Sequence, residues 1–194
     1  MVGGPSLAGL CPLTTLRTPR LELRRWQASD ADGFAAMNSD PEVMRWLPSA
    51  LTRKESDQLM TQIDDGFASR GFGVWAAERR DDGAFLGFVG LNVPRWELPF
   101  WACVEVAWRL SRAAWGFGYA TEGAREALRF GFEDVGLERI RSWTVPENRR
   151  SLAVMDRLGM TRLGEFDHPA LPDGHALRRH VHMVLERTDW QAAR

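Results

Sequence analysis

The feature that most constrains the fold of this 194-residue chain is a strand, a glycine-rich loop and a helix that follow one another over residues 104–133. Apolar and polar residues alternate along 104–110, which is typical of a strand with one buried face. Gly116 and Gly118 interrupt the next segment, and small residues then recur with helical spacing over 119–133. The first amides of a helix lack partners and carry about half a positive charge. The segment therefore predicts either an anion-binding site or a tight turn that holds no ligand.

Two common phosphate-binding motifs do not match this loop. A Rossmann loop places its third glycine three residues after the second, near the start of a repeated βαβ array. Here the next glycine is Gly123, and the loop lies past the middle of the chain. A P-loop ends in Gly-Lys followed by Ser or Thr, whereas the single lysine of this chain is Lys54. Both nucleotide-binding motifs are therefore excluded.

The remaining patterns predict strands and helices in a mixed α/β order. Alternating residues predict strands over 21–26, 73–79, 85–93, 139–145, 161–166 and 175–187, in addition to 104–110. Capping residues and apolar spacing predict helices over 29–37, 52–70, 119–133 and 146–158, with one further helical turn over 41–47. Thr52 and Glu55 form the sequence signature of a capping box, and Gly71 is expected to end that helix. No linker or repeat divides the chain, so one domain is expected.

Composition excludes several classes of protein. The chain has 25 basic and 26 acidic residues, a balance that argues against a dedicated nucleic-acid partner. No segment approaches the ~20 apolar residues of a membrane span. Cys11 and Cys103 cannot form the disulfide framework of a secreted protein. Residues 1–16 lack the apolar core of a signal peptide and are expected to be a flexible leader. We therefore expect a cytoplasmic protein with no membrane partner.

Several motifs then occur in a recognisable order. They are TPRL (18–21), EVAWRL (105–110), WGFGYATE (115–122), FEDVGLERI (132–140), PEN (146–148) with Ser151, LGM (158–160) and RTDW (187–190). This order resembles the GNAT superfamily of acyl-CoA N-acyltransferases, and more narrowly its RimJ/RimL-type branch, which includes ribosomal-protein N-terminal acetyltransferases. The resemblance covers about residues 17–190, the expected N-acetyltransferase domain. It implies an α/β (α+β) fold with a mixed, mostly antiparallel sheet of about seven strands flanked by about four helices.

The resemblance also implies acetyl-CoA as co-substrate and assigns residues to it. The diphosphate is expected on the loop, the pantetheine arm beside the strand that ends at Leu110, and the thioester carbonyl at a backbone amide near Arg109 or Leu110. Asn148 is expected to contact the pantetheine arm and Ser151 to lie near the sulfur. The implied cofactor-binding residues are Trp108, Arg109, Leu110, Trp115, Gly116, Phe117, Gly118, Tyr119, Ala120, Thr121, Asn148 and Ser151. Trp108 is expected mainly to pack in the core.

Two residues are candidates for catalysis, each with a structural alternative. Ser151 is the candidate proton donor to the leaving thiolate, because the single tyrosine, Tyr119, belongs to the loop. Asn148 and Ser151 also stand at a helix start, where Asn148 is a common capping residue. Glu105 is the candidate base, acting directly or through water. Its alternative is a strand-surface carboxylate paired with an arginine.

The acceptor amine is expected to meet the segments 41–51 and 166–175. A protein or peptide N-terminal α-amine is the first hypothesis, and a small-molecule amine such as an antibiotic, polyamine or amino acid is the second. A non-catalytic acyl-CoA-binding module is the third. His180 and His182 share one strand face but lack a placed third ligand, so we expect no metal. Similar proteins are commonly dimers, and a homodimer is one arrangement that the resemblance implies.

Overall fold

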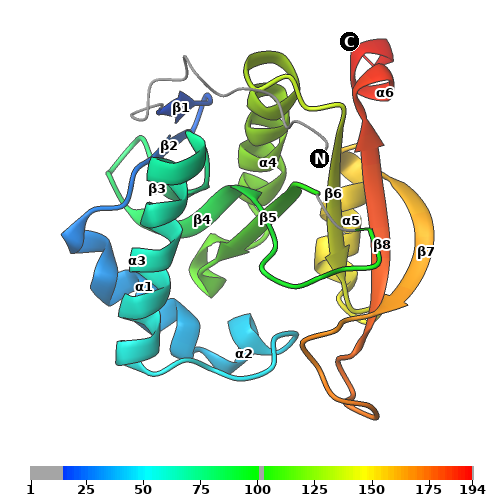
Figure 1. Cartoon of the computed structure of the whole chain (residues 1–194). Helices are drawn as coiled ribbons and strands as arrows, with labels where there is room; N and C mark the ends of the chain where they lie inside the picture. The colour runs from blue at the N-terminus through cyan, green and yellow to red at the C-terminus, as the bar shows by residue number, and fades with distance from the viewer. Residues whose placement is uncertain (1–14, 101–102, 194) are drawn as a thin grey trace.

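One sheet organises the computed structural model, which describes residues 15–100 and 103–193. Its eight strands have the order β1-β2-β3-β4-β5-β6-β8-β7 (Figure 1). The strands are β1 (Leu16–Arg17), β2 (Leu21–Arg24), β3 (Val74–Arg79), β4 (Phe85–Asn92), β5 (Glu105–Leu110), β6 (Arg139–Thr144), β7 (Thr161–Asp167) and β8 (Arg179–Glu186). The helices are α1 (Ala31–Ser39), α2 (Pro41–Met44), α3 (Arg53–Arg70), α4 (Tyr119–Arg129), α5 (Arg149–Arg157) and α6 (Arg187–Ala192). Single turns at Ala28–Asp30, Arg112–Ala114 and Phe130–Asp134 complete the elements, the last of them a π-helical continuation of α4.

The sheet is antiparallel everywhere except between β5 and β6. These two strands run parallel and share one Cα pair, Glu105 with Arg141. The amide of Arg141 donates to the carbonyl of Val104 at 2.9 Å, one step before that pair. From Val106 to Leu110, β5 has no paired residue in β6. We call this divergence the splay between β5 and β6, and it opens the middle of the sheet.

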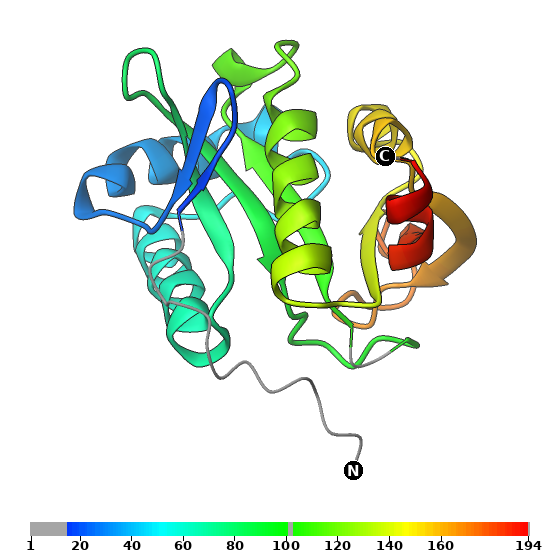
Figure 2. The same cartoon turned by 90° about the horizontal axis from the view of Figure 1, so that it is seen from above.

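Helices cover both faces of the sheet, because neighbouring residues of a strand point to opposite sides. Val89, Val106 and Leu110 join the larger core under α4. Phe88 and Ala107 face the other way and pack with α1 and α3. Figures 1 and 2 show α1 and α3 together on one side of the sheet and α4 on the other. Side chains of β5 therefore divide between two environments, which decides what each can contact.

The expected fold class is confirmed: the chain is a single mixed α/β domain with a mostly antiparallel sheet. The capping box of Thr52 and Glu55 is present, and Gly71 ends α3 in a left-handed conformation with φ of 75°. The predicted strands between residues 73 and 166 agree with observed strands, with small differences at the ends.

Three local predictions differ from the structure. The final strand is shorter than the predicted range 175–187, and the short helix α6 follows it. This helix was not predicted because it has no buried residue and therefore no apolar stripe in the sequence. Leu16, assigned to the leader, pairs with Leu23 and is buried; residues 1–14, including Cys11, lie outside the described residues. The sequence also offered Ser29 or Asp30 as the residue that caps the first helix, but Asp30 precedes α1 without a side-chain cap, because Arg24 binds its carboxylate at 2.8 Å.

The described helices include none long and apolar enough to cross a membrane.

Candidate active site

The loop before α4 presents a row of free backbone amides. Gly116 and Gly118 have φ angles of 84° and 82°, which favour glycine because a side chain is strained there. The amides of Gly116, Phe117 and Gly118 have no hydrogen-bond partner among the described residues. Those of the first turn of α4, which begins at Tyr119, have no intrahelical partner. A Cβ built on Gly116 would meet no atom within 4 Å, so the space above the loop is open. These residues fit the diphosphate of a CoA ligand.

Arg20 fixes this loop to the start of the sheet. Its guanidinium donates to the carbonyl of Phe117 at 2.9 Å and to the carboxylate of Glu122 at 2.6 Å. Thr18 Oγ1 donates to the same carboxylate at 2.6 Å. The guanidinium also lies 4.7 Å from the ring centre of Tyr119. Neutralising Glu122 preserves the positive field of the helix N-terminus for an anion.

Tyr119 is buried and belongs to the support of the loop. Its ring stacks on the exposed ring of Phe117 and also contacts the guanidinium of Arg20. Ala120 and Thr121 continue the first turn of α4 and are half-buried. The structure thus places the whole predicted segment from Trp115 to Thr121 in one loop and first helical turn that carries unpaired backbone amides.

Backbone groups of β5 supply the next part of the site. The carbonyl of Val106 accepts a hydrogen bond from Ser142 Oγ of β6 at 3.0 Å. The carbonyl of Leu110 accepts one from Trp115 Nε1 at 2.9 Å. Both carbonyls therefore point away from β4 and toward the splay. Because backbone direction alternates along an antiparallel strand, every second residue of β5 faces the splay.

This alternation separates the two amides predicted near the thioester. The amides of Trp108 and Leu110 face the splay, whereas the amide of Arg109 faces β4. Trp108 also packs its half-buried side chain against the larger core, as expected. The splay therefore offers a β5 edge of unpaired amides that can bind an extended chain as an added strand does.

Asn148 and Ser151 lie at the opposite side of the splay, where β6 ends and α5 begins. Asn148 Oδ1 accepts the amide of Ser151 at 3.3 Å, and Asn148 Nδ2 donates to Thr144 Oγ1 at 2.9 Å and Ser151 Oγ at 3.0 Å. The capping role is therefore present. The Ser151 hydroxyl accepts from Asn148 and has no acceptor for its own proton among the described residues, so it is free to donate.

The side chain of Arg150 connects the start of α5 to the loop before α4. The guanidinium of Arg150 lies 4.3 Å from the ring centre of Trp115, and Trp115 in turn is bound to the end of β5. This contact brings the loop, the β5 edge and the start of α5 together around the splay. Arg150 was not among the predicted site residues, although it directly precedes Ser151 in the sequence.

Glu105 lies at the start of β5, on the face opposite Val106. Its Oε1 accepts a hydrogen bond from Asn92 Nδ2 at 2.6 Å, and its Oε2 has no partner in the described ranges. Burial raises the pKa of Glu105 to about 7, against the lowering effect of the Asn92 hydrogen bond. The alternative of a surface carboxylate paired with an arginine is wrong, because its partner is an uncharged amide. Asn92 was missed because its role follows from the pairing of β4 with β5.

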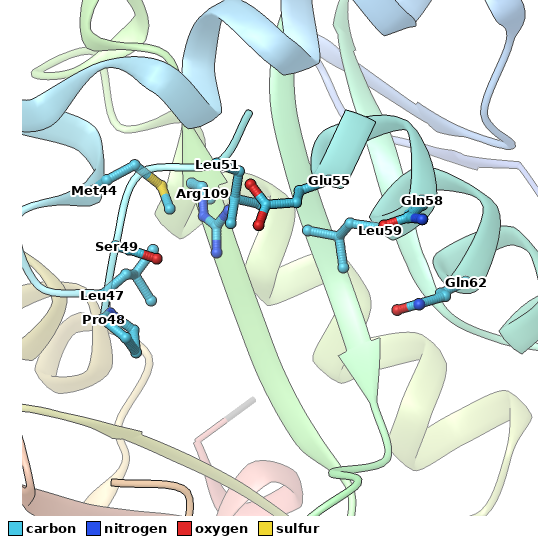
Figure 3. A pocket seen from close by; sticks show the side chains of 10 residues that line it. All are labelled: Met44, Leu47, Pro48, Ser49, Leu51, Glu55, Gln58, Leu59, Gln62 and Arg109. Carbon is cyan, nitrogen blue, oxygen red and sulfur yellow. The ribbon is translucent and has the colours of Figure 1, made fainter. Parts of the chain in front are cut away.

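A hollow of about 350 Å³ opens on this same face of the sheet. Its walls come from the segment between Met44 and Leu51 and from α3, and Arg109 of β5 reaches into it (Figure 3). The first of the two expected acceptor segments, 41–51, thus borders this hollow, whereas the segment 166–175 is not part of its wall.

Three histidines near the C-terminal end of the sequence, His168, His180 and His182, lie in an aromatic cluster. The rings of His168 and His180 are 5.1 Å apart, and that of His182 stacks on Phe100 at 3.9 Å. Burial lowers the pKa of His168 and His182 to about 4, and His182 Nε2 lies 2.7 Å from Arg141. Within residues 15–100 and 103–193, no three His, Cys, Asp or Glu side chains are arranged to hold a metal ion.

Comparison with known proteins identifies the class that this fold and site define. A model of the acetyltransferase (GNAT) domain matches residues 20–161. The FsC-acetyl coenzyme A-N(2)-transacetylase of Aspergillus fumigatus is 35% identical over 189 residues, covering 91% of this chain and 77% of the relative. This chain belongs to the GNAT acetyltransferase family, and it is an acyltransferase that transfers an acetyl group from acetyl-CoA.

Solved structures agree with the fold. A GNAT-family acetyltransferase from Bacillus anthracis has a TM-score of 0.75 at 22% identity, over 90% of this chain and 99% of that one. The ribosomal-protein-S5-alanine acetyltransferase from Vibrio fischeri has a TM-score of 0.72 at 20% identity, over 91% and 98%. At these identities the likeness is one of architecture.

Proposed function

We propose that this enzyme acetylates primary α-amines, with Glu105 as general base and Ser151 as proton donor. The observation that carries the proposal is the carboxylate of Glu105, whose pKa is raised to about 7 beside the splay. At neutral pH it is partly ionised and matched to an α-amine with an ordinary pKa near 8. A lysine amine, with a pKa near 10.4, is more difficult to deprotonate.

The residues around the splay have different roles in the proposed reaction. Acetyl-CoA supplies an activated thioester and a thiolate leaving group. Residues 115–121 hold the diphosphate, and the free amides of Trp108 and Leu110 bind the extended arm and stabilise negative charge on a carbonyl oxygen. Glu105 Oε2 takes the proton of the amine, and the Ser151 hydroxyl donates toward sulfur while Asn148 holds it.

Two acceptor classes follow from the motifs and the comparisons. A protein or peptide N-terminus is the first, because the motifs resemble those of the RimJ/RimL-type branch. A small-molecule amine is the second, and the similarity to an enzyme named as an N(2)-transacetylase favours it.

The test is CoA release from acetyl-CoA across a panel of peptides with different N-termini, amino acids, aminoglycosides and polyamines. We expect turnover of α-amines and little turnover of amines with a pKa above 10. Preferred acetylation of polyamines or lysine side chains would contradict the proposal. Absence of CoA release with every acceptor, while acetyl-CoA still binds, would also contradict the proposal.

Replacing Ser151 by alanine should lower kcat about tenfold, with little change in the Kd for acetyl-CoA. The effect is modest because a thiolate with a pKa near 8.5 needs limited help from an acid. Helix α5 should stay intact, because its cap uses the backbone amide of Ser151 rather than the hydroxyl. Ser69→Ala on α3 is the matched control. An unchanged kcat in Ser151→Ala would remove the proton-donor role.

A further inference from the structure

Arg109 is an arginine without a charged partner. Its Nη1 donates to Asn38 Oδ1 at 2.7 Å, and its guanidinium lies 5.3 Å from the ring centre of Phe88. Among the residues that the structure describes, no carboxylate oxygen lies within 4 Å of it. Burial lowers the pKa of Arg109 to about 10, with no opposing effect from an acidic neighbour. A partly buried cation of this kind is costly unless something negative pairs with it.

The guanidinium is held in place by a buried polar chain. Asn38 and Ser56 are fully buried, and Asn38 Nδ2 donates to Ser56 Oγ at 3.2 Å. This bond orients the amide so that its oxygen faces Arg109. Only one nitrogen of Arg109 is engaged in this way, and Nε and Nη2 have no partner within the described ranges. The guanidinium of Arg109 is therefore held in place, and its remaining N–H donors are open to the hollow in Figure 3.

The other ionisable group of the hollow is already engaged. Glu55 accepts both the amide and the hydroxyl of Thr52 through one carboxylate oxygen, at 2.7 Å each, as the cap of α3. Its charge disfavours a ligand with many negative groups, and Arg109 disfavours a polycation. One carboxylate is the chemistry that this hollow fits best.

The position of Arg109 relates the hollow to the proposed base. Arg109 and Glu105 project from the same face of β5, four residues apart, which is about 13 Å along a strand. Met44, Leu51 and Leu59 provide apolar wall between the helices and the strand. This separation is between backbone positions, and the long arginine side chain shortens the gap that an acceptor has to bridge between an amine at Glu105 and a carboxylate at Arg109.

We propose that the acceptor of this enzyme carries a carboxylate near its amine, and that Arg109 binds that carboxylate. The inference rests on the proposed function, because it takes the hollow as the acceptor site. The carboxylate has two sources: the α-carboxylate of an amino-acid-like small molecule, or an acidic side chain at the start of a peptide.

The experiment compares matched acceptor pairs that differ only in charge. They are amino acids with their α-carboxamides, and peptides with Asp or Asn, or Glu or Gln, at the first two positions. Binding of each to the CoA-saturated protein is measured by titration calorimetry, and acetylation by CoA release. In the wild type, we expect one class of carboxylate to bind about 10- to 100-fold better than its amide, as for a charge-assisted hydrogen bond. The pair that responds identifies the source.

The variants assign that preference to Arg109. Arg109→Gln should reduce the carboxylate preference to within about threefold, and Arg109→Lys should retain part of it. Arg95→Gln, which removes an exposed cation bound to Gln62 of the same wall, should leave it unchanged. Thermal stability of Arg109→Gln should be unchanged or higher, because an uncompensated buried charge is lost.

Two results would overturn the inference: no pair favours the carboxylate, or the preference survives in Arg109→Gln. These failures are distinct from failure of the proposed function. Carboxylate-dependent binding without any turnover would contradict the function and support the role of Arg109. Turnover of α-amines regardless of a carboxylate would support the function and reject the role.

Discussion

Gly118→Val should weaken acetyl-CoA binding more than about 100-fold, as expected when two charge-assisted hydrogen bonds of the loop are lost. Gly118 has φ of 82° at the start of α4, a conformation that a β-branched residue adopts only with strain. A Cβ at this position would lie 3.7 Å from Nη2 of Arg20, so the larger valine side chain would also disturb the guanidinium that binds the carbonyl of Phe117. Titration calorimetry with acetyl-CoA measures the effect directly.

The matched control lies beyond the far end of the same helix. Gly136 has φ of 78°, and a Cβ there meets no atom within 4 Å. Gly136→Val therefore introduces similar backbone strain at the end away from the loop. We expect both variants to lose similar thermal stability, while only Gly118→Val loses the ligand. Equal affinity of the two variants would show that the loop does not hold acetyl-CoA.

Glu105→Gln should lower kcat about 100-fold or more, within the usual range for loss of a general base. The pKa of Glu105 is about 7 in the folded protein, so the wild-type rate should rise as pH increases through 7. That rise should be absent in the variant. Both Glu105 and the acceptor amine titrate in this range. Acceptors with different amine pKa values separate the two, because the inflection caused by Glu105 stays at the same pH while that of the amine moves. Steady-state kinetics between pH 5.5 and 9 would measure both.

Glu105→Gln should stabilise the folded protein at neutral and higher pH, although it lowers kcat. Burial raises the pKa of Glu105 above its ordinary value of 4.5, so folding favours the protonated form. The stability this provides is complete below about pH 4.5 and is lost as pH rises through 7. Glu105→Gln keeps the neutral form and should raise the Tm at pH 8, whereas exposed Glu138→Gln should change neither Tm nor kcat. A lower Tm together with an unchanged pH profile would indicate a purely structural carboxylate.

Local features of the site were predictable because they depend on near neighbours. Gly116 and Gly118 indicated a tight turn before a helix, and both have positive φ in the structure. Thr52 and Glu55 are three residues apart, and the capping box they predict is present. Alternation along β5 placed Glu105 on the face opposite Val106. Each of these inferences needs only the geometry of a single turn or strand.

Contacts between distant segments were not predictable in the same way. Arg20 and Glu122 are 102 residues apart, and Arg109 and Asn38 are 71 apart. Their meeting depends on which strands are neighbours and in which register, and a shift of one residue would turn each side chain to the other face. The amide of Arg109 illustrates the point, since only the pairing of β5 shows that it faces β4.

The sequence by itself therefore determined the class of fold, the glycine loop, the order of motifs and the residue types available for acetyl transfer. Near-neighbour geometry and hydrophobic periodicity are sufficient for these. Only the tertiary structure decided how β5 and β6 separate after Glu105, that Asn92 is the partner of this base, and that Arg109 enters the hollow without a carboxylate partner of its own among the described residues. Burial and hydrogen-bond partners set the pKa of Glu105 and the binding chemistry of Arg109. Burial and partners arise only when distant segments pack together.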